Sequence, residues 1–314
     1  NLARQRKRKG DPINGWLNLF KPVDITSTQA VAILKRKYNA QKVGHGGTLD
    51  PLADGILPIA FGEATKTVQW AMDAQKEYVF TIRWGISTES QDAEGEVTAT
   101  SEARPRREQV EELLKGYLGT IEQVPPKFSA IKVDGQRAYD LAREGEEFEL
   151  TSREVDVFTA SVIGMPDADH TVIHVTSGKG FYVRAMARDL AFDLECEGHI
   201  SQLRRTRVGQ FGAPAAIPLA MIEEAENMET LMGFLQPIHA MLENVPSVDI
   251  TREEAGNIRH GRTIVLLPHI IERWKEESSD DPDDRAAIAV CDGKAVALGD
   301  VRAGRFEPSR VFTS

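Results

Sequence analysis

The chain has 314 residues, a formal net charge of −10 and 41% hydrophobic residues, which is typical of a globular protein with a large domain and a small one. No apolar run approaches the roughly 20 residues that a membrane-spanning helix needs, so we expect no membrane association. The two cysteines, Cys196 and Cys291, lie far apart in sequence and favour a reducing compartment over a disulfide scaffold, so we predict a cytoplasmic protein.

Charged residues are unevenly distributed along the chain. Basic residues cluster at 4–9, 35–37 and 204–207, and acidic residues cluster at 223–226 and 276–284. The negative net charge argues against a nucleic-acid partner only where the two signs are mixed, and here they are separated. Each cluster alone is typical of solvated surface, whereas three basic clusters near loops with glycine and aromatic residues favour a polyanionic partner.

The first half of the chain alternates single helices with strands. The pattern predicts a flexible basic arm (1–12), a strand (16–20), a helix (26–38), a strand (78–85), a helix opening at Pro105 and a strand (128–133). In the first helix, Thr26 or Ser27 can cap the first turn, and Ala30 and Leu34 share one face. We therefore expect this helix to pack that face against a core.

The second half combines further strands with a separate C-terminal module. Strands are expected over 155–164 and 170–177, a helix from Phe181, a helix over 251–260, and strands over 263–267, 286–291 and 295–301. The acidic segment 275–285 is expected to form a mobile loop. Irregular interleaving of strands and helices indicates an α+β or mixed-sheet fold rather than a doubly wound parallel sheet. A boundary near 245–247 divides a main domain (13–245) from a small β-rich module (246–314).

Several common enzyme signatures are absent from the sequence. There is no G-x-x-x-x-G-K-[ST] phosphate loop, no G-x-G-x-x-G after a strand, no G-x-S-x-G elbow, and neither C-x-x-C nor H-E-x-x-H. His170 and His174 lie four residues apart in a segment that is predicted to be a strand. We therefore expect no metal site there.

A glycine-rich loop, GHGGTLDPLADGILP (44–58), carries one carboxylate, Asp50, directly before Pro51. A residue before proline is held extended, and the upstream glycines permit backbone angles that other residues avoid. The carboxylate either ties down its own loop in an Asx turn or is a reactive group beside the apolar Leu49 and Leu52. A partly buried carboxylate stays ionised only beside a cation or hydrogen-bond donors, so a nucleophilic Asp50 requires a nearby arginine.

Two further segments supply candidate partners for this carboxylate. In SGKGFYVRAMARDLA (177–191), Arg184 follows the aromatic Tyr182 and falls in the first turn of the predicted helix; its alternative is a surface arginine. Tyr78 in KEYVF is a candidate to stack on a base, or else a strand tyrosine with its hydroxyl in water. The segment 124–145 adds cations, among them Lys132, in a semi-apolar run.

These segments together resemble one family. KVGHGGTLDPLADGILPIAFGEATK (42–66) resembles the G-H-x-G-T-L-D-P-x-A-x-G-x-L motif of the TruB-type pseudouridine synthases. The segments that match the family's other motifs, in the same order, are FKPVDITS, KEYVFTIRWGISTESQDAEG, VPPKFSAIKVDGQRAYDLAREG, VTSGKGFYVRAMARDL and HISQLRRTRVGQF. The resemblance covers about residues 13–219, and the tail resembles the PUA-like RNA-binding module of bacterial members.

The resemblance implies isomerisation of uridine 55 in the T-loop of tRNA to pseudouridine, without cofactor or metal. It implies a mixed, mainly antiparallel sheet core in two halves with flanking helices, and an active cleft between the halves. The family's nucleophilic aspartate matches Asp50, its base-stacking tyrosine matches Tyr78, and the arginine that pairs with the aspartate matches Arg184. Whether Asp50 attacks the ribose C1′ or the uracil C6 stays open.

The resemblance also implies substrate-binding residues. The leucine at the floor of the uracil pocket matches Leu203, and the histidine that helps to hold the everted loop matches His45. Lys21 belongs to a motif that supports the catalytic loop. Together with Tyr182 and Lys132, these residues complete the predicted substrate-binding set.

Two positions depart from the family pattern. The family usually has Thr where this chain has Gly46, and often Cys where Ser177 stands. Neither position is the predicted nucleophile, so the departures concern the stiffness of the loop around His45 rather than the reaction.

We expect a monomer that acts on the T-arm of tRNA without an obligatory protein partner, with the runs 35–37 and 204–207 on RNA phosphates. One alternative is an RNA-binding tRNA-folding chaperone in which catalysis is secondary. Another is the related guide-RNA-dependent synthase subunit, which needs partner proteins. The short tail argues against that subunit, because its C-terminal module is longer.

Overall fold

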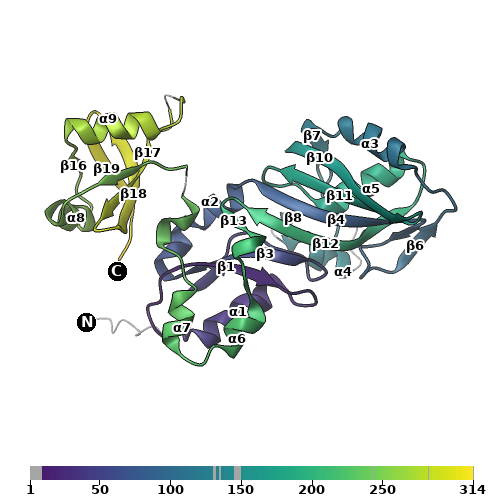
Figure 1. Ribbon diagram of the computed structural model, residues 1–314, viewed down its shortest axis with the longest axis horizontal. Coiled ribbons are helices and arrows are strands. Elements are labelled where there is room, and N and C mark those ends of the chain that lie inside the picture. The colour runs from purple at the N-terminus through teal and green to yellow at the C-terminus, as the bar shows by residue number, and fades with distance from the viewer. Residues whose placement is uncertain are drawn as a thin grey trace.

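A ten-stranded mixed sheet is the main feature of the computed structural model, which describes residues 9–129, 132–133, 136–144, 150–242, 244–281 and 283–313. Its strands run in the order β14 (Ile217–Pro218), β1 (Gly15–Lys21), β3 (Asp54–Phe61), β12 (Gly198–Val208), β4 (Lys76–Trp84), β11 (His170–Ser177), β10 (Arg153–Asp167) and β7 (Gly119–Gln123), with β13 (Phe211–Gly212) beside β12 and β2 (Val43–His45) beside β3. The pairs β1–β14 and β3–β12 are parallel, and the other pairs of this sheet are antiparallel. The predicted α+β fold with a mixed, mainly antiparallel sheet is therefore confirmed (Figure 1).

Helices flank this sheet at both ends (Figure 1). They are α1 (Ser27–Lys37), α2 (Val68–Asp73), α3 (Arg107–Lys115), α4 (Ala138–Arg143), α5 (Val183–Asp193), α6 (Leu219–Glu224) and α7 (Met228–Gly233), with 3-10 turns η1 (Gly62–Thr67), η2 (Ala213–Ala215) and η3 (Ile238–Met241). Two short hairpins stand apart from the sheet, β5 (Ile86–Thr88) with β6 (Val97–Thr100) and β8 (Lys132–Val133) with β9 (Gln136–Arg137). No helix in the described ranges is long and apolar enough to cross a membrane.

A second, five-stranded sheet begins at Ser247. Its order is β15 (Ser247–Asp249), β17 (Ala286–Cys291), β18 (Lys294–Arg302), β19 (Arg305–Val311) and β16 (Ile264–Val265), and α8 (Arg252–Arg259) and α9 (Pro268–Glu277) pack against it. It has its own buried cluster around Phe306. The end of β19 contacts the part of the chain that forms the large sheet. Lys66 Nζ, in η1, donates to the Val311 carbonyl at 2.7 Å, and the next residue, Phe312, is buried in a cluster with Leu242.

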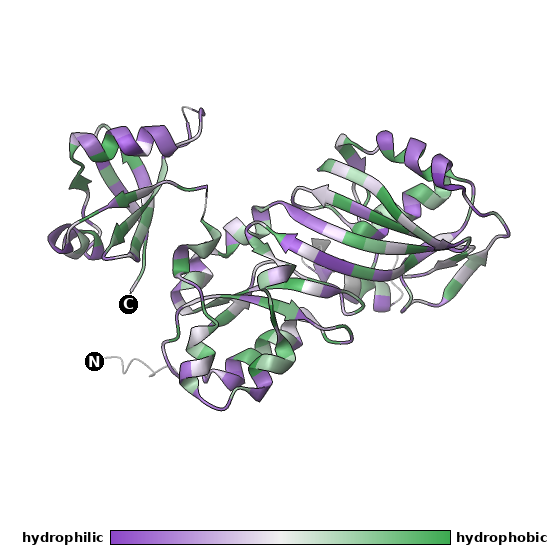
Figure 2. Cartoon of the chain, viewed as in Figure 1, coloured by the Kyte–Doolittle hydropathy of each residue, from purple (hydrophilic) through white to green (hydrophobic). Residues whose placement is uncertain are grey.

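Strands β4 and β11 bury alternate residues, as strands with one covered face do, whereas β1 and β3 are buried along almost their whole length. Along β4 the side chains of Tyr78, Phe80, Ile82 and Trp84 are buried, and the residues that alternate with them are partly exposed. Figure 2 shows the corresponding alternation of hydrophobic and hydrophilic residues along these strands. On the neighbouring β12, Leu203 pairs with Phe80 and Arg205 pairs with Tyr78, so these side chains face the same side of the sheet as Tyr78.

Helix α1 forms as the sequence predicts. Thr26 is its N-cap: its hydroxyl accepts from the Gln29 N–H at 3.0 Å, and the Gln29 side chain accepts from the Thr26 N–H at 2.8 Å. This reciprocal pair is a capping box, which satisfies two amides that the helix leaves without carbonyl partners. Ala30 and Leu34 are fully buried, as their shared face predicts.

The predicted strand over 128–133 is found in part. Among its described residues, Lys132–Val133 forms a strand, in the hairpin with Gln136–Arg137, whereas Phe128 and Ser129 do not. The Phe128 carbonyl accepts from the Arg184 guanidinium, and the Ser129 N–H donates to the Lys127 carbonyl. An apolar run indicates burial but not the hydrogen-bond partners of its backbone.

The C-terminal module contains three elements that were not predicted: strand β15, helix α9 and strand β19. Helix α9 extends to Glu277, so the acidic segment 275–285 begins inside a helix that was not predicted. Strand β19 was also missed, because its sequence contains Pro308, which is unfavourable within a sheet. The structure accommodates Pro308 opposite Gly299, next to a register shift between β18 and β19.

We predict that Ser177→Cys raises the melting temperature. Ser177 is fully buried, and its hydroxyl has no hydrogen-bond partner among the described residues. An unpartnered buried polar group costs about 1–3 kcal/mol, and a thiol is easier to bury. Thermal unfolding under reducing conditions measures the change.

Thr171→Val on the same strand is the matched control. The Thr171 hydroxyl accepts from the Trp84 indole N–H at 2.8 Å, so this variant is expected to melt lower. If Ser177→Cys also melted lower than wild type, the Ser177 hydroxyl would have a partner and the prediction would be wrong.

Candidate active site

Asp50 lies in the loop between β2 and β3, and neighbouring segments hold the loop backbone. The Leu49 N–H donates to the Ser27 hydroxyl at 2.9 Å, and the Asp24 N–H donates to the Pro51 carbonyl at 2.8 Å. These bonds leave the Asp50 carboxylate unused. The Asx-turn alternative therefore does not describe this loop, and the carboxylate is available to another group.

That group is Arg184, in the first turn of α5. Its Nε donates to Asp50 Oδ2 at 2.9 Å and its Nη2 faces Asp50 Oδ1 at 3.4 Å. The remaining donors reach backbone carbonyls, Ser90 at 3.1 Å and Phe128 at 2.6 Å. The Arg184 side chain is 6% exposed and that of Asp50 is 32% exposed, so the arginine is buried behind a carboxylate that keeps an open side.

The open side of Asp50 faces a cavity of about 300 Å³. Its lining brings together segments from across the chain: Gly47, Thr48, Leu49, Asp50, Met72, Lys76, Tyr78, Ser129, Gly178, Gly180, Phe181, Tyr182, Val183, Arg184, Leu203 and Arg205. Tyr78 and Phe181 lie 6.1 Å apart between ring centroids, tilted by 44°. The structure therefore places Asp50, Tyr78, Tyr182, Arg184 and Leu203 around one largely apolar space, which suits a flat, uncharged ring.

Arg205 holds the backbone of the loop that carries Asp50, a role that the sequence did not reveal. Its Nε donates to the Ile56 carbonyl at 2.8 Å, Nη1 to Thr48 at 3.2 Å and Nη2 to Gly47 at 3.0 Å. Arg205 is only 3% exposed, so the expectation that it contacts RNA phosphates is wrong. The missed signal was its spacing of two from Leu203, since alternate residues of a strand share one face.

The other basic residues of the two runs are partly occupied. Lys37 Nζ donates to the carbonyls of Glu223 and Ala225 at 2.7 and 2.8 Å. Arg204 makes two bonds of 2.8 Å to Asp54. Arg207 is half-exposed and lies 3.8 Å from its nearest carboxylate oxygen, and Lys35 and Arg36 are exposed, so these three side chains are accessible to a ligand.

Lys21 and His45 do not line the cavity. Lys21 is fully buried, and its Nζ donates to the carbonyls of Pro22 and Ile25 at 2.7 and 2.8 Å. Burial lowers the pKa of Lys21 to about 8, against the opposing effect of nearby carboxylates including Asp50. Its predicted substrate contact is replaced by a structural one next to the loop. His45 accepts from a loop amide through Nδ1 at 3.3 Å, and burial lowers its pKa.

Lys132, the remaining predicted substrate-binding residue, has a side chain that lies outside the described residues. His170 and His174 each contact a different carboxylate: His170 lies 2.8 Å from Asp167, and His174 lies 3.0 Å from Glu77. Within the described ranges, no group of three or more His, Cys, Asp or Glu residues is placed to hold a metal ion.

Gly46 has a packing reason. A Cβ at this position would lie 2.5 Å from the Cβ of Ala71 on α2 and 3.4 Å from that of Pro58, closer than side-chain carbons approach. The Gly46 N–H also donates to the Pro58 carbonyl at 2.8 Å, which holds the loop against the sheet. The departure from the family's usual Thr therefore accompanies close contact between the loop and α2.

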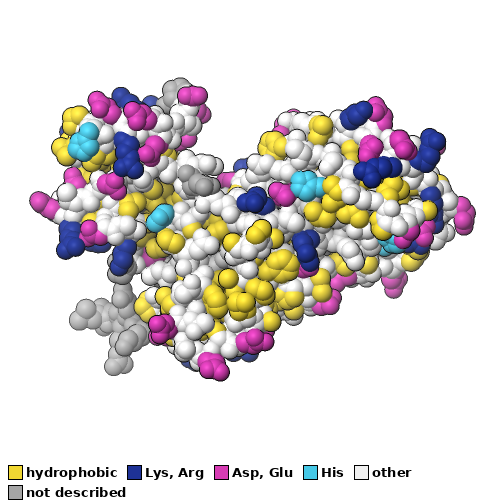
Figure 3. Space-filling model, in the orientation of Figure 1, with side chains coloured by type: hydrophobic (Ala, Val, Ile, Leu, Met, Phe, Trp, Pro, Cys, Tyr) yellow, Lys and Arg dark blue, Asp and Glu magenta, His cyan; other side chains and the backbone are white. Residues whose placement is uncertain are grey.

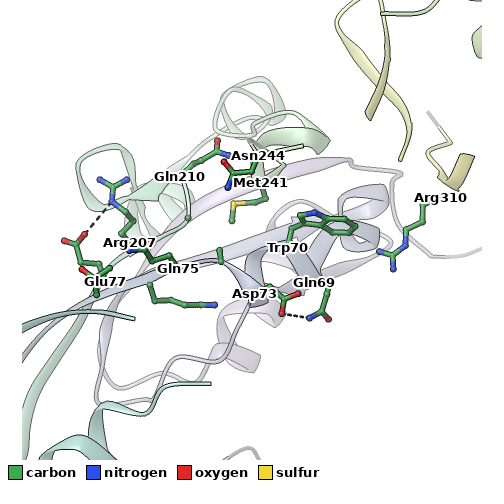
Figure 4. A pocket seen from close by; sticks show the side chains of 14 residues that line it. Gln69, Trp70, Asp73, Gln75, Glu77, Arg207, Gln210, Met241, Asn244 and Arg310 are labelled. Carbon is green, nitrogen blue, oxygen red and sulfur yellow. Dashed lines mark hydrogen bonds and ion pairs between the residues drawn. The ribbon is translucent and has the colours of Figure 1, made fainter. Parts of the chain in front are cut away.

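A larger groove of about 710 Å³ adjoins the cavity, and the two share Lys76. Figure 4 shows Trp70 of α2 near one end, with Arg310 of the C-terminal strand reaching toward it. The Arg310 guanidinium lies 5.4 Å from the indole centroid. The lining is rich in amides and cations: Gln69, Trp70, Asp73, Ala74, Gln75, Lys76, Glu77, Thr176, Arg207, Gly209, Gln210, Met241, Asn244 and Arg310.

On the face in Figure 3, basic and acidic side chains are interspersed among hydrophobic ones, and neither sign forms a single large patch.

Chains in two solved complexes share this fold. One is an H/ACA RNP bound to a substrate RNA containing 2′-deoxyuridine, with a TM-score of 0.69, 21% identity, and coverage of 100% of this chain and 93% of that one. Another is a Cbf5-Nop10-Gar1 complex, with a TM-score of 0.68, 24% identity, and coverage of 95% of this chain and 84% of that one. At this identity the likeness shows the fold.

Sequence comparison establishes the family. Residues 35–183 match the TruB family pseudouridylate synthase (N terminal domain), and residues 184–243 match the tRNA pseudouridylate synthase B C-terminal domain. The chain is 52% identical to tRNA pseudouridine synthase B of Caulobacter vibrioides, over 98% of both chains. It is 46% identical to that of Rhizobium johnstonii, over 99% of this chain and 100% of the relative. The chain belongs to the TruB family of pseudouridylate synthases, and the predicted family is confirmed.

We predict that Gly46→Thr destabilises the protein by about 1–3 kcal/mol, because the added atoms overpack the contact with Ala71. Urea unfolding of Gly46→Thr, Ala71→Gly and the double variant measures the coupling between the two positions. The free energy of unfolding of the double variant is expected to fall by less than the sum of the decreases in the two single variants. Strict additivity would show that the two residues do not compete for the same space.

Proposed function

We propose that the protein converts uridine 55 in the T-loop of tRNA to pseudouridine, with Asp50 as the nucleophile. The relatives named tRNA pseudouridine synthase B, at 52% and 46% identity over nearly the whole chain, support tRNA as the substrate. The observation that carries the role of Asp50 is its carboxylate, paired on one side with buried Arg184 and open on the other to a mostly apolar cavity.

The cavity supports base flipping. A uridine stacked in an RNA loop must leave the stack to react, which takes a few kcal/mol. Stacking on an aromatic ring is worth about 1–3 kcal/mol per base, and Tyr78 presents such a ring at the cavity wall. Leu203, on the same side of the sheet, adds an apolar surface for the base.

Arg184 orients Asp50 for attack. Its guanidinium donates to both carboxylate oxygens, at 2.9 and 3.4 Å, and so fixes the direction in which the carboxylate faces the cavity. Asp50 then adds to the ribose C1′ or to the uracil C6. On either route the bond from N1 to C1′ breaks, the uracil turns and C5 bonds to C1′. The bond to Asp50 breaks, displaced by C5 on the C1′ route or eliminated from C6 on the other, and the proton on C5 is lost while N1 gains one. Atoms balance without an oxidant, a reductant or a second substrate.

The groove beside the cavity is placed to receive RNA beyond the flipped nucleotide. It shares Lys76 with the cavity and carries Arg207 and Arg310 at other points of its lining. Phosphate contacts of this kind position an RNA without reading its bases. We assign residues 246–314 as an RNA-binding module that contributes Arg310 to this groove.

The alternative function is an RNA-binding tRNA-folding chaperone in which catalysis is secondary. The Asp50–Arg184 pair favours the enzyme, because binding alone does not require an ionised carboxylate in an apolar cavity. We also propose that the protein acts as a monomer without a protein partner, unlike a guide-RNA-dependent subunit. Turnover of a bare tRNA transcript by the purified protein tests this directly.

We predict that Asp50→Asn abolishes turnover, lowering it by about a thousandfold or more, since the amide is not a nucleophile. A tRNA transcript labelled with tritium at uridine C5 releases tritium when C5 loses its proton, and this release is the measurement. The same transcript with cytidine at position 55 is expected to release none.

Asp54→Asn is the matched control, because Asp54 belongs to the same loop region but pairs with Arg204 and does not line the cavity. It is expected to keep activity within a few-fold. Turnover by Asp50→Asn at the wild-type rate would exclude Asp50 as the nucleophile. Full rescue of tRNA folding by a catalytically inactive variant would favour the chaperone function over the enzyme.

We predict that RNA affinity falls as pH rises through 8. Burial, and then the charge of Arg205, lower the pKa of Lys76 to about 8, so its ammonium is mostly charged at pH 6.5 and mostly neutral at pH 8.5. A phosphate binds the charged form, and the charged fraction drops about fourfold over this range. Fluorescence anisotropy of a T-arm hairpin bound to Asp50→Asn protein measures the loss.

Lys76→Arg is expected to flatten this dependence, because a guanidinium stays charged throughout the range. If the Lys76→Arg protein lost as much RNA affinity between pH 6.5 and 8.5 as the protein with Lys76, the pH dependence would belong to another group.

A further inference from the structure

Ser129 carries a buried hydroxyl without a partner in the same cavity as Asp50. The residue is 4% exposed and lines the cavity. Its Oγ has no hydrogen-bond partner among the described residues. Most buried polar side chains in folded proteins are hydrogen-bonded, so an exception in a ligand cavity needs a physical reason.

The charged side chains that line the cavity are already engaged. Asp50 and Arg184 bond to each other, Arg205 bonds to three backbone carbonyls, and Lys76 Nζ donates to the Met72 carbonyl. Ser129 therefore supplies a neutral side-chain group whose hydrogen-bonding capacity is unused in the free protein. Such a group is suited to a neutral ligand.

The position of Ser129 is tied to the reacting pair. The preceding residue, Phe128, accepts a 2.6 Å hydrogen bond from Arg184 through its carbonyl, and the Ser129 N–H donates to the Lys127 carbonyl at 3.1 Å. The same arginine that pairs with Asp50 thus holds the backbone that presents the hydroxyl. A ligand beside Asp50 lies within the cavity that Ser129 lines.

We propose that the Ser129 hydroxyl hydrogen-bonds the polar edge of the flipped uracil, an inference that rests on the proposed function. This edge presents carbonyl, N–H and carbonyl in sequence, and a hydroxyl both donates and accepts. The half-turn that exchanges N1 for C5 rotates the ring about the line through N3 and C6. It swaps the two carbonyls, so the edge shows the same pattern before and after the turn.

This symmetry predicts how loss of the hydroxyl divides between kinetic parameters. A contact available to the base before and after the turn stabilises the bound ground state and the transition state together. Ser129→Ala is therefore expected to raise KM by about 3- to 10-fold and to change kcat by less than twofold, with T-arm hairpin as substrate.

Stability gives a second, independent readout. Ser129→Ala removes no native hydrogen bond, so its melting temperature is expected to equal or exceed that of wild type. Ser27→Ala is the matched control, because the buried Ser27 hydroxyl accepts from the Leu49 N–H. Removing this hydroxyl breaks a native hydrogen bond, so the variant is expected to have a lower melting temperature than wild type. A parallel loss of melting temperature in Ser129→Ala would overturn the proposal in favour of a structural role.

Binding to inactive protein separates this inference from the proposed function. Hairpin affinity is compared between Asp50→Asn and Asp50→Asn/Ser129→Ala, using target uridine and target 2′-deoxyuridine. The Ser129→Ala substitution is expected to lower the affinity for both hairpins equally, by about 3- to 10-fold.

An effect confined to the uridine hairpin would assign Ser129 to the ribose hydroxyl and overturn the contact with the base. No effect on either hairpin, with wild-type turnover intact, would overturn the inference and leave the proposed function standing. Failure of the wild-type protein to release tritium would instead overturn the proposed function.

Discussion

The hydrogen-bonded ion pair between Arg184 and Asp50 joins the parts of the candidate site. From the first turn of α5, one guanidinium reaches the Asp50 carboxylate and the carbonyls of Ser90 and Phe128. A buried guanidinium without an anion is strongly unfavourable, so removing the Asp50 side chain would leave Arg184 without its carboxylate partner. The contact that joins these three segments is therefore also the one that orients the proposed nucleophile.

A second arginine gives the same loop its position relative to the sheet. Arg205 lies on β12, between β3 and β4, and its donors hold the carbonyls of Gly47, Thr48 and Ile56. Arg184 orients the carboxylate, while Arg205 holds the backbone that carries it. The loop is thus held by a helix and a central strand, which are stiffer supports than other loops.

Much of the fold followed from local patterns. The capping box at Thr26, the alternation along β4 and the helical spacing after Phe181 each reflect contacts within a few residues, so they could be predicted. The conformation of Phe128 and Ser129 could not, because the Phe128 carbonyl bonds to the distant Arg184 rather than to a strand. Strand β19 was hidden by Pro308, whose place beside a register shift depends on the neighbouring strand.

Sequence patterns were sufficient to select Asp50 as a candidate acid, to require an arginine beside it and to identify the family. Long-range packing selected the partners. Asp50 and Arg184 are separated by 134 residues, and the run 204–207 holds one arginine paired with Asp54, one buried under the loop and one lining the groove. Local periodicity indicates which way a side chain points, but what it meets there depends on strand register and on contacts between distant segments.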